Sequence, residues 1–142
     1  MKTVRDVLKV KGSDVCCVDP NATVFEALRL MAEKEIGALM VMEGAQVVGL
    51  ISERDYARKV VLQGRASPTT LVKEIMISHV VHTHIDQPIE ECMAVMTEKR
   101  VRHLPVIDKG KLVGIISIGD LVKAIIADQQ FIIEQLERYI KG

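Results

Sequence analysis

GLISERD, at residues 49–55, follows an apolar run and predicts a β-strand that leads into a helix. Nearly the same heptad, GIISIGD, returns at residues 114–120, an offset of 65 positions. This offset is close to half of the 142-residue chain. A recurrence at such an offset predicts a fold built from two homologous halves.

The duplication extends to the segments that precede the two heptads. At the same offset, residues 23–34 align without a gap to residues 88–99. Both segments carry apolar residues at the three-to-four spacing of a helix with one buried face. We therefore expect one amphipathic helix at the same place in each half.

Short β-branched runs follow each of these helices, separated by a glycine-bearing turn, which is the pattern of a β-hairpin. The expected hairpins pair residues 38–42 with 47–51 and residues 104–107 with 112–116. A further strand is expected at residues 15–18 and at residues 80–85. Each half then has the order strand, helix, strand, strand, helix, which places the chain in the mixed α/β (α+β) class.

The lead-ins VRDVL (residues 4–8) and VKEIM (residues 72–76) also correspond, at an offset of 68. Each half is about 60 residues, near the lower limit for one independent core, so we expect the halves to pack on each other. The expected divisions are residues 1–62 for the first repeat with its lead-in helix, 63–71 for a linker, 72–126 for the second repeat, and 127–142 for an extension of the C-terminal helix.

An apolar stripe at helical spacing continues into this C-terminal extension. Two interpretations stay open, that the stripe covers the chain's own core or that it packs on a second subunit. We favour the first. The stripe consists of Val122, Ile125, Ile126, Gln129, Ile132, Ile133, Leu136 and Tyr139.

The overall composition limits the kinds of partner and the cellular location that we expect for the chain. The chain has 19 basic and 19 acidic residues, which does not indicate a nucleic-acid or membrane partner. Its apolar runs are too short to span a bilayer, and its first residues do not resemble a signal peptide. Three cysteines, an odd number, fit reduced thiols. We expect a cytoplasmic protein.

The repeated heptads contain Ser-x-x-Asp, which has two interpretations. Ser52 with Asp55, and Ser117 with Asp120, have the spacing of a helix N-cap, and a duplication would copy a cap. Alternatively, a helix N-terminus can receive an anion, glycine allows close approach, and an aspartate can accept hydrogen bonds from a vicinal diol, as a ribose phosphate requires.

The segments IGALMVMEGAQVVGLISERDYA (residues 36–57) and RHLPVIDKGKLVGIISIGDLV (residues 102–122) resemble the first and second repeats of the CBS domain family, named after cystathionine beta-synthase. The resemblance covers nearly the whole chain except the long C-terminal helix. It is closest to bacterial proteins made of one tandem CBS pair. It implies two β-α-β-β-α repeats packed about a pseudo-two-fold axis, with a long C-terminal helix added.

The resemblance also implies a regulatory function. CBS pairs bind adenosine-containing ligands, namely AMP, ADP, ATP, NAD or S-adenosylmethionine, in a cleft between the repeats, and so sense energy or metabolite state. We expect this chain to bind one of them, to form a homodimer and to signal to an effector protein not identified by the sequence. The alternative is a structural dimerisation module without a small-molecule ligand. No catalytic constellation is found, so an enzyme is not expected.

In the family, the motif of one repeat faces a strand edge of the other. Carried over, Leu50, Ser52 and Asp55 would face Val101 and Arg102, whereas Ile115, Ser117 and Asp120 would face Ile36 and Gly37. The candidate nucleotide-binding residues are Ile36, Gly37, Leu50, Ser52, Arg54, Asp55, Val101, Arg102, His103, Ile115, Ser117 and Asp120.

The two sites are not expected to be equal. Arg54, Arg102 and His103 all belong to the site built on Asp55, so we predict that this site holds phosphates better. Met40 also departs from the family, because the equivalent position usually carries a proline, as Pro105 does in the second repeat.

Other chemistry is less well supported. His79, His82, His84 and His103 lack a carboxylate or cysteine at a recognised ligand spacing, so no metal site is predicted. The three cysteines, Cys16, Cys17 and Cys92, have no neighbouring base in sequence that would activate a thiol nucleophile.

Overall fold

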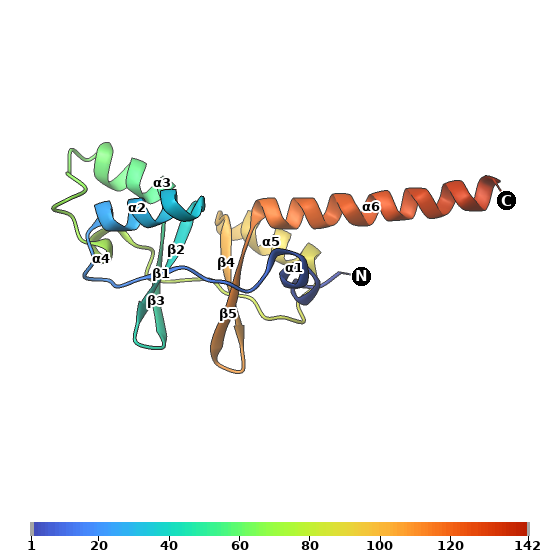
Figure 1. The fold of residues 1–142 in the computed structure, drawn as a ribbon, viewed down its shortest axis with the longest axis horizontal. Helices are drawn as coiled ribbons and strands as arrows, with labels where there is room; N and C mark the ends of the chain where they lie inside the picture. The colour runs from blue at the N-terminus through green and yellow to red at the C-terminus, as the bar shows by residue number, and fades with distance from the viewer. Residues whose placement is uncertain (1, 142) are drawn as a thin grey trace. The chain divides into compact units, whose positions relative to one another are not determined.

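A computed structural model describes residues 2–141 and confirms the mixed α/β class, the two repeats and the long C-terminal helix (Figure 1). The chain divides into two compact units. One unit is Asp14–Val81, and the other joins the segment that ends at Ser13 to the segment that begins at His82. Each unit is described by itself.

The Asp14–Val81 unit contains a three-stranded sheet in the order β1-β2-β3, in which β2 is parallel to β1 and antiparallel to β3. Helix α2 packs its buried face, with Ala27 and Met31, on Leu39 and Ile51 of the sheet. The elements are β1 (Cys17–Val18), α2 (Val24–Lys34), β2 (Ala38–Glu43), β3 (Gln46–Ser52), α3 (Glu53–Tyr56), the π-helix η1 (Ala57–Val61) and α4 (Val72–Ile75).

The second unit contains a two-stranded antiparallel sheet with helices at its side. Its elements are α1 (Val4–Lys11), α5 (Ile89–Lys99), β4 (His103–Asp108), β5 (Lys111–Ser117) and α6 (Ile118–Lys141). The hairpin turn has Lys109 at φ 52° and Gly110 at φ 78°. Positive φ at both central residues is what a two-residue type I′ turn requires.

The duplication reaches the irregular features of the backbone. A bulge interrupts the hairpin register after Val41 in one repeat and after Val106 in the other, 65 positions later. The left-handed residues that end α2 and α5, Glu35 and Arg100, are also 65 positions apart. The two hairpins confirm the prediction from the sequence, and the two repeats also share irregular features that were not predicted.

The strand expected at residues 80–85 is wrong, because only a single bridge between Thr83 and Val106 forms there. In the first repeat, the backbone N–H of Met40 donates to the Cys16 carbonyl at 3.1 Å. The equivalent donor in the second repeat would belong to Pro105, which has no N–H. The ladder therefore loses the hydrogen bond that would extend it to Val81.

The two lead-ins pack on the opposite repeats. The backbone N–H of Val4 donates to the Gln87 carbonyl at 3.0 Å, so α1 lies on the second repeat. Ile77, just after α4, exchanges backbone hydrogen bonds of 2.9 and 3.0 Å with Leu50 in the first repeat. The boundaries drawn from the sequence stay a prediction, but the compact units exchange the segments that precede each repeat.

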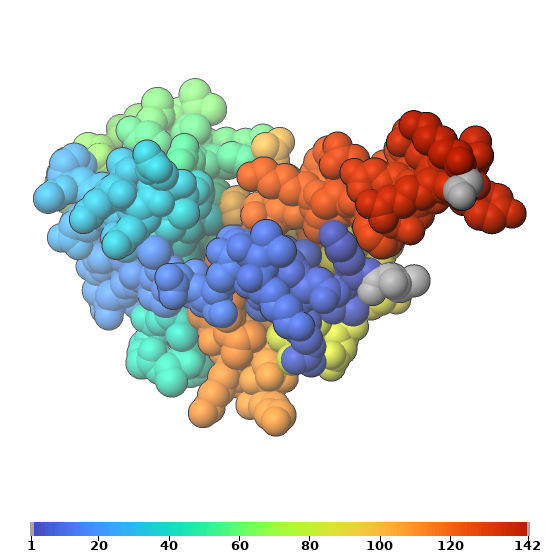
Figure 2. All heavy atoms as spheres, turned by 45° about the vertical axis from the view of Figure 1, so that its right-hand side comes forward, coloured from blue at the N-terminus to red at the C-terminus, as the bar shows by residue number. Residues whose placement is uncertain are grey.

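The favoured interpretation of the apolar stripe is wrong for most of α6. Leu121 is buried, but Ile133 is 54% exposed and Leu136 is 56% exposed. Figure 2 shows the last turns of α6, in red, projecting into solvent. Over residues 2–141, no helix combines the length and the apolarity needed to cross a membrane.

Candidate ligand-binding site

The first Ser-x-x-Asp motif forms a complete capping box at the start of α3. The Asp55 backbone N–H donates to Ser52 Oγ at 3.3 Å, and Asp55 Oδ2 accepts from the Ser52 backbone N–H at 2.9 Å. Ser52 Oγ also lies 3.0 Å from Asp55 Oδ2. The helix-capping interpretation of the motif is therefore confirmed, and the cap uses one of the two carboxylate oxygens of Asp55.

The second oxygen of Asp55 faces a lysine. Lys59 Nζ lies 3.4 Å from Asp55 Oδ1 and donates to the Ile75 carbonyl at 2.9 Å. Lys59 follows Asp55 by four positions, so the pair had a local signal in the sequence that the prediction did not use.

The second motif repeats the cap at the start of α6. Asp120 Oδ2 accepts from the Ser117 backbone N–H at 2.8 Å, and the Asp120 N–H donates to Ser117 Oγ at 3.1 Å. The same Oδ2 accepts from Lys11 Nζ at 2.7 Å. Within residues 2–141, no hydrogen bond reaches Oδ1 of Asp120, so this oxygen can still accept.

Lys11 has a second partner, the Ile115 carbonyl, at 2.6 Å. In the first repeat the equivalent carbonyl, of Leu50, accepts instead from the Ile77 backbone N–H. A lysine side chain therefore takes the place of a backbone pair at the edge of the second hairpin. No local pattern indicated Lys11, because it lies 109 positions from Asp120 and reaches it only through the exchange of the lead-ins.

Burial raises the pKa of Asp120, but the hydrogen bonds from Lys11 and from the Ser117 backbone outweigh it. The net effect holds the pKa of the Asp120 carboxyl below its ordinary value. The carboxylate is therefore kept in its charged form, which is the form that accepts hydrogen bonds from a diol.

The strand-edge candidates lie beside the motif of their own repeat. The Gly37 carbonyl accepts from the Glu53 N–H at 3.0 Å, and the Arg102 carbonyl accepts from the Ile118 N–H at 2.9 Å. Ile36 and Val101 immediately precede them and are half-buried, whereas His103 pairs with Ser117 across the hairpin. The proposed facing of residues from different repeats stays a prediction.

The two glycines of the heptads lie against the exchanged lead-ins. A Cβ atom at Gly49 would lie 2.6 Å from Met76 Sδ and 2.9 Å from the Ile77 carbonyl oxygen. At Gly114 it would lie 2.8 Å from a methyl group of Leu8. Both glycines thus admit the exchanged lead-ins, which is a packing role that the sequence analysis did not assign to them.

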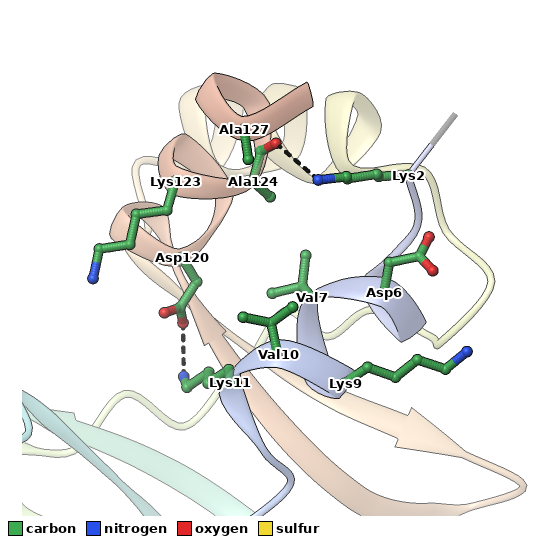
Figure 3. A pocket seen from close by; sticks show the side chains of 10 residues that line it. All are labelled: Lys2, Asp6, Val7, Lys9, Val10, Lys11, Asp120, Lys123, Ala124 and Ala127. Carbon is green, nitrogen blue, oxygen red and sulfur yellow. Dashed lines mark hydrogen bonds and ion pairs between the residues drawn. The ribbon is translucent and has the colours of Figure 1, made fainter. Parts of the chain in front are cut away.

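A hollow of about 720 Å³ lies beside Asp120, between α1 and α6 (Figure 3). Four lysines and two aspartates surround an apolar floor, so its walls carry a net positive charge. The residues that line it are Lys2, Asp6, Val7, Lys9, Val10, Lys11, Asp120, Lys123, Ala124 and Ala127.

Two of the cysteines, Cys17 and Cys92, lie in environments that do not activate a thiol. Burial raises the pKa of the Cys92 thiol, whose sulfur lies 3.5 Å from Thr83 Oγ1. Burial also raises the pKa of Cys17. Since a thiol nucleophile needs a lowered pKa, neither environment favours nucleophilic chemistry.

Comparison with known proteins defines the class. The CBS domain model matches residues 4–62 and residues 72–127, and the chain therefore belongs to the CBS domain family, as a tandem pair. A putative signal-transduction protein with CBS domains from Burkholderia ambifaria is 54% identical, with a TM-score of 0.87 over 90% of this chain and 96% of that one. The mitochondrial CBS domain-containing protein CBSX3 of Arabidopsis thaliana is 34% identical over 99% of this chain and 72% of its own length.

A more distant solved structure shows the fold with ligands. The CBS domain pair of protein MJ0100, in complex with 5′-methylthioadenosine and S-adenosyl-L-methionine, is 24% identical. It matches 90% of this chain and 98% of its own with a TM-score of 0.80.

Proposed function

We propose that the protein is a regulatory module that binds an adenosine-containing ligand, namely AMP, ADP, ATP, NAD or S-adenosylmethionine, and that it is not an enzyme. The proposal rests on one observation, that the two oxygens of each motif carboxylate have different partners. Oδ2 of Asp55 and of Asp120 serves the helix cap. Among the described residues, Oδ1 of Asp55 contacts a lysine, and Oδ1 of Asp120 has no hydrogen bond.

A ribose supplies the missing donors. Its vicinal hydroxyls would donate to Oδ1, and the helix N-terminus nearby suits an anionic group. The MJ0100 pair shows that this fold holds adenosine compounds. Arg54, Arg102 and His103 remain our basis for proposing that the site built on Asp55 holds phosphates. The facing of Leu50, Ser52 and Asp55 with Val101 and Arg102, and of Ile115, Ser117 and Asp120 with Ile36 and Gly37, is part of the same proposal.

The regulatory mechanism is differential binding. A ligand that contacts both repeats favours whichever conformation or assembly binds it more tightly, and an effector protein reads that state. We place this activity in the cytoplasm.

Thermal-shift and calorimetric titration with AMP, ADP, ATP, NAD and S-adenosylmethionine tests the proposal. A true ligand raises the melting temperature once its concentration exceeds its dissociation constant. We expect Asp55→Asn and Asp120→Asn each to abolish one binding event. Asp14→Asn, which changes an exposed carboxylate outside both motifs, is the matched control. If none of the five compounds binds, the alternative of a structural module whose motifs only cap helices is correct.

We also propose that the partner of the exposed stripe of α6 is a second copy of this chain. The stripe follows spacings of four and three residues, the repeat of a coiled-coil seam. Gln129 is the one polar member, and a central polar residue is best satisfied by its own counterpart across a two-fold axis. Ile126, Ile133 and Ile140 widen the seam on one side. The seam is Ile118, Val122, Ile125, Gln129, Ile132, Leu136 and Tyr139.

A further inference from the structure

We propose that Lys11 makes the site built on Asp120 selective for adenosine phosphates over S-adenosylmethionine. This inference rests on the proposed function and adds to it the class of ligand. Lys11 holds Oδ2 of Asp120 while Oδ1 stays open to a ribose, and the Lys11 ammonium group then turns to pair with a phosphate of the bound ligand.

Lys11 lies beside the oxygen that the adenosine proposal assigns to the ribose, Oδ1 of Asp120. Its Nζ atom contacts Asp120 Oδ2 at 2.7 Å and the Ile115 carbonyl at 2.6 Å. The Lys11 side chain is 31% exposed and the Asp120 side chain 19% exposed, so the pair is partly desolvated. A diol can therefore bind Oδ1 while the Lys11 ammonium group lies beside it on Oδ2.

Lys11 is free to move without disturbing its helix. It is the last residue of α1, and the next residue, Gly12, leaves the helix at φ 98°. A lysine side chain has four rotatable bonds, so its ammonium group can shift by several ångströms while the backbone stays in place.

The hollow beside Asp120 determines which ligand gains from that shift. Lys2, Lys9, Lys11 and Lys123 outnumber Asp6 and Asp120 around it (Figure 3). Lys2 reaches across the hollow toward the Ala124 carbonyl, at 3.5 Å. Phosphate groups are attracted to such walls, whereas the cationic sulfonium of S-adenosylmethionine is repelled.

The Asp55 site lacks this arrangement. Its lysine, Lys59, lies on the adjoining helical segment, contacts Asp55 at 3.4 Å, and is fixed to the Ile75 carbonyl within the same unit. The contribution of Lys11 therefore belongs to the second motif alone. Because the Asp55 site is itself proposed to hold phosphates, that contribution has to be measured where only the second motif binds.

The test uses Lys11→Ala in the full chain, in a background of Asp55→Asn that leaves the Asp120 site. The matched control is Lys34→Ala, since Lys34 is likewise an exposed lysine in the last turn of a helix, α2. AMP, adenosine and S-adenosylmethionine are titrated by calorimetry at one salt concentration, with circular dichroism to check folding.

With Lys11 present, AMP should bind more tightly than S-adenosylmethionine. Lys11→Ala should weaken AMP on the order of tenfold, while adenosine, which has no phosphate for Lys11 to contact, should bind equally well. Lys34→Ala should change neither. An unchanged ratio of AMP to adenosine affinity in Lys11→Ala overturns the inference and leaves the proposed function intact, whereas absence of binding by all three compounds in every variant overturns both.

A second measurement needs no nucleotide. Acylation of lysine amines followed by mass spectrometry should modify Lys11 faster in Asp120→Asn than in the unsubstituted chain, with Lys34 as the internal reference. Equal rates for Lys11 would show that Asp120 does not retain it, and this result would also overturn the inference.

Discussion

Lys11 Nζ and Asp120 Oδ2 lie 2.7 Å apart and join residues separated by 109 positions. The contact links the end of α1 to the first turn of α6 within one compact unit. Because Lys11 also donates to the Ile115 carbonyl, one ammonium group ties the lead-in to the hairpin and to the C-terminal helix. Its removal should therefore affect stability as well as ligand selection.

Asp120→Asn should lower the free energy of unfolding at pH 7 by about 1–2 kcal/mol, because it removes the charge from both the cap and the Lys11 contact. The folded-state pKa of Asp120 is held below its ordinary value, so its contribution is present above the unfolded pKa of about 3.9 and is lost as the pH falls through the folded pKa. Urea unfolding at pH 7 and at pH 3 measures this. The difference between the two proteins should shrink at pH 3.

The difference in unfolding free energy between the unsubstituted chain and Asp120→Asn reports on Asp120 and not on other carboxyl groups. Hydrogen bonding by the Thr3 backbone N–H holds the pKa of Asp6 below its ordinary value, so the unsubstituted chain has further acid sensitivity. That part cancels in the difference. A difference of the same size at both pH values would contradict an ionic role for Asp120.

Gly49→Ala should destabilise the protein by about 1–3 kcal/mol, because the new methyl group meets the Ile77 carbonyl, which is backbone and cannot turn away. Gly114→Ala should cost less, since its nearest neighbour is the flexible end of Leu8. Chemical unfolding of both variants gives the order. Gly119→Ala is the control, because its methyl group has ordinary contact with Ser117 Oγ at 3.7 Å and lies in a helix.

If Gly49→Ala were as stable as Gly119→Ala, the lead-in at Met76 and Ile77 would have moved aside without loss of stability. The packing of Ile77 against Leu50 would then be looser than its two backbone hydrogen bonds indicate.

The order of elements could be predicted from the sequence because it depends on local patterns that the duplication repeats. Both hairpins, the helices at residues 24–34 and 89–99, and the caps at Ser52 and Ser117 follow from periodicity and spacing. The exchange of lead-ins could not be predicted, since α1 is covalently next to one repeat and packs on the other. Lys11 was missed for this reason, and the packing role of Gly49 was missed for the same reason.

The absence of a strand at residues 80–85 has a signal in the sequence, the proline at position 105. Pro105 was used to compare strand edges at the site, whereas its main effect is the missing donor toward Val81. Pro105→Ala should therefore create an amide at position 105 that bonds to the Val81 carbonyl and exchanges slowly with solvent. Hydrogen exchange followed by NMR measures it, with the Met40 amide, bonded to Cys16, as the reference. Rapid exchange at position 105 would show that the proline is not the cause.

Self-association through α6 can be tested by placing charges on its apolar seam. Ile132 and Leu136 are more than half exposed and lie on the proposed seam, so Ile132→Glu with Leu136→Glu would place two charges in it. Sedimentation and light scattering should show a dimer of the unsubstituted 15.8 kDa chain and a dissociation constant at least tenfold weaker for the double variant. Glu134→Lys, on the opposite face of the same helix, changes charge without touching the stripe and should leave the dimer intact.

The result also separates the two surfaces by which copies of this chain could associate. If the double variant remains a dimer of undiminished affinity, the seam of α6 is not the contact, and association must use the repeats themselves. If it becomes a monomer and still binds AMP, sensing and assembly are independent. If it becomes a monomer and loses AMP, binding and assembly are coupled, and linkage then requires AMP to tighten the dimer of the unsubstituted chain by the same factor.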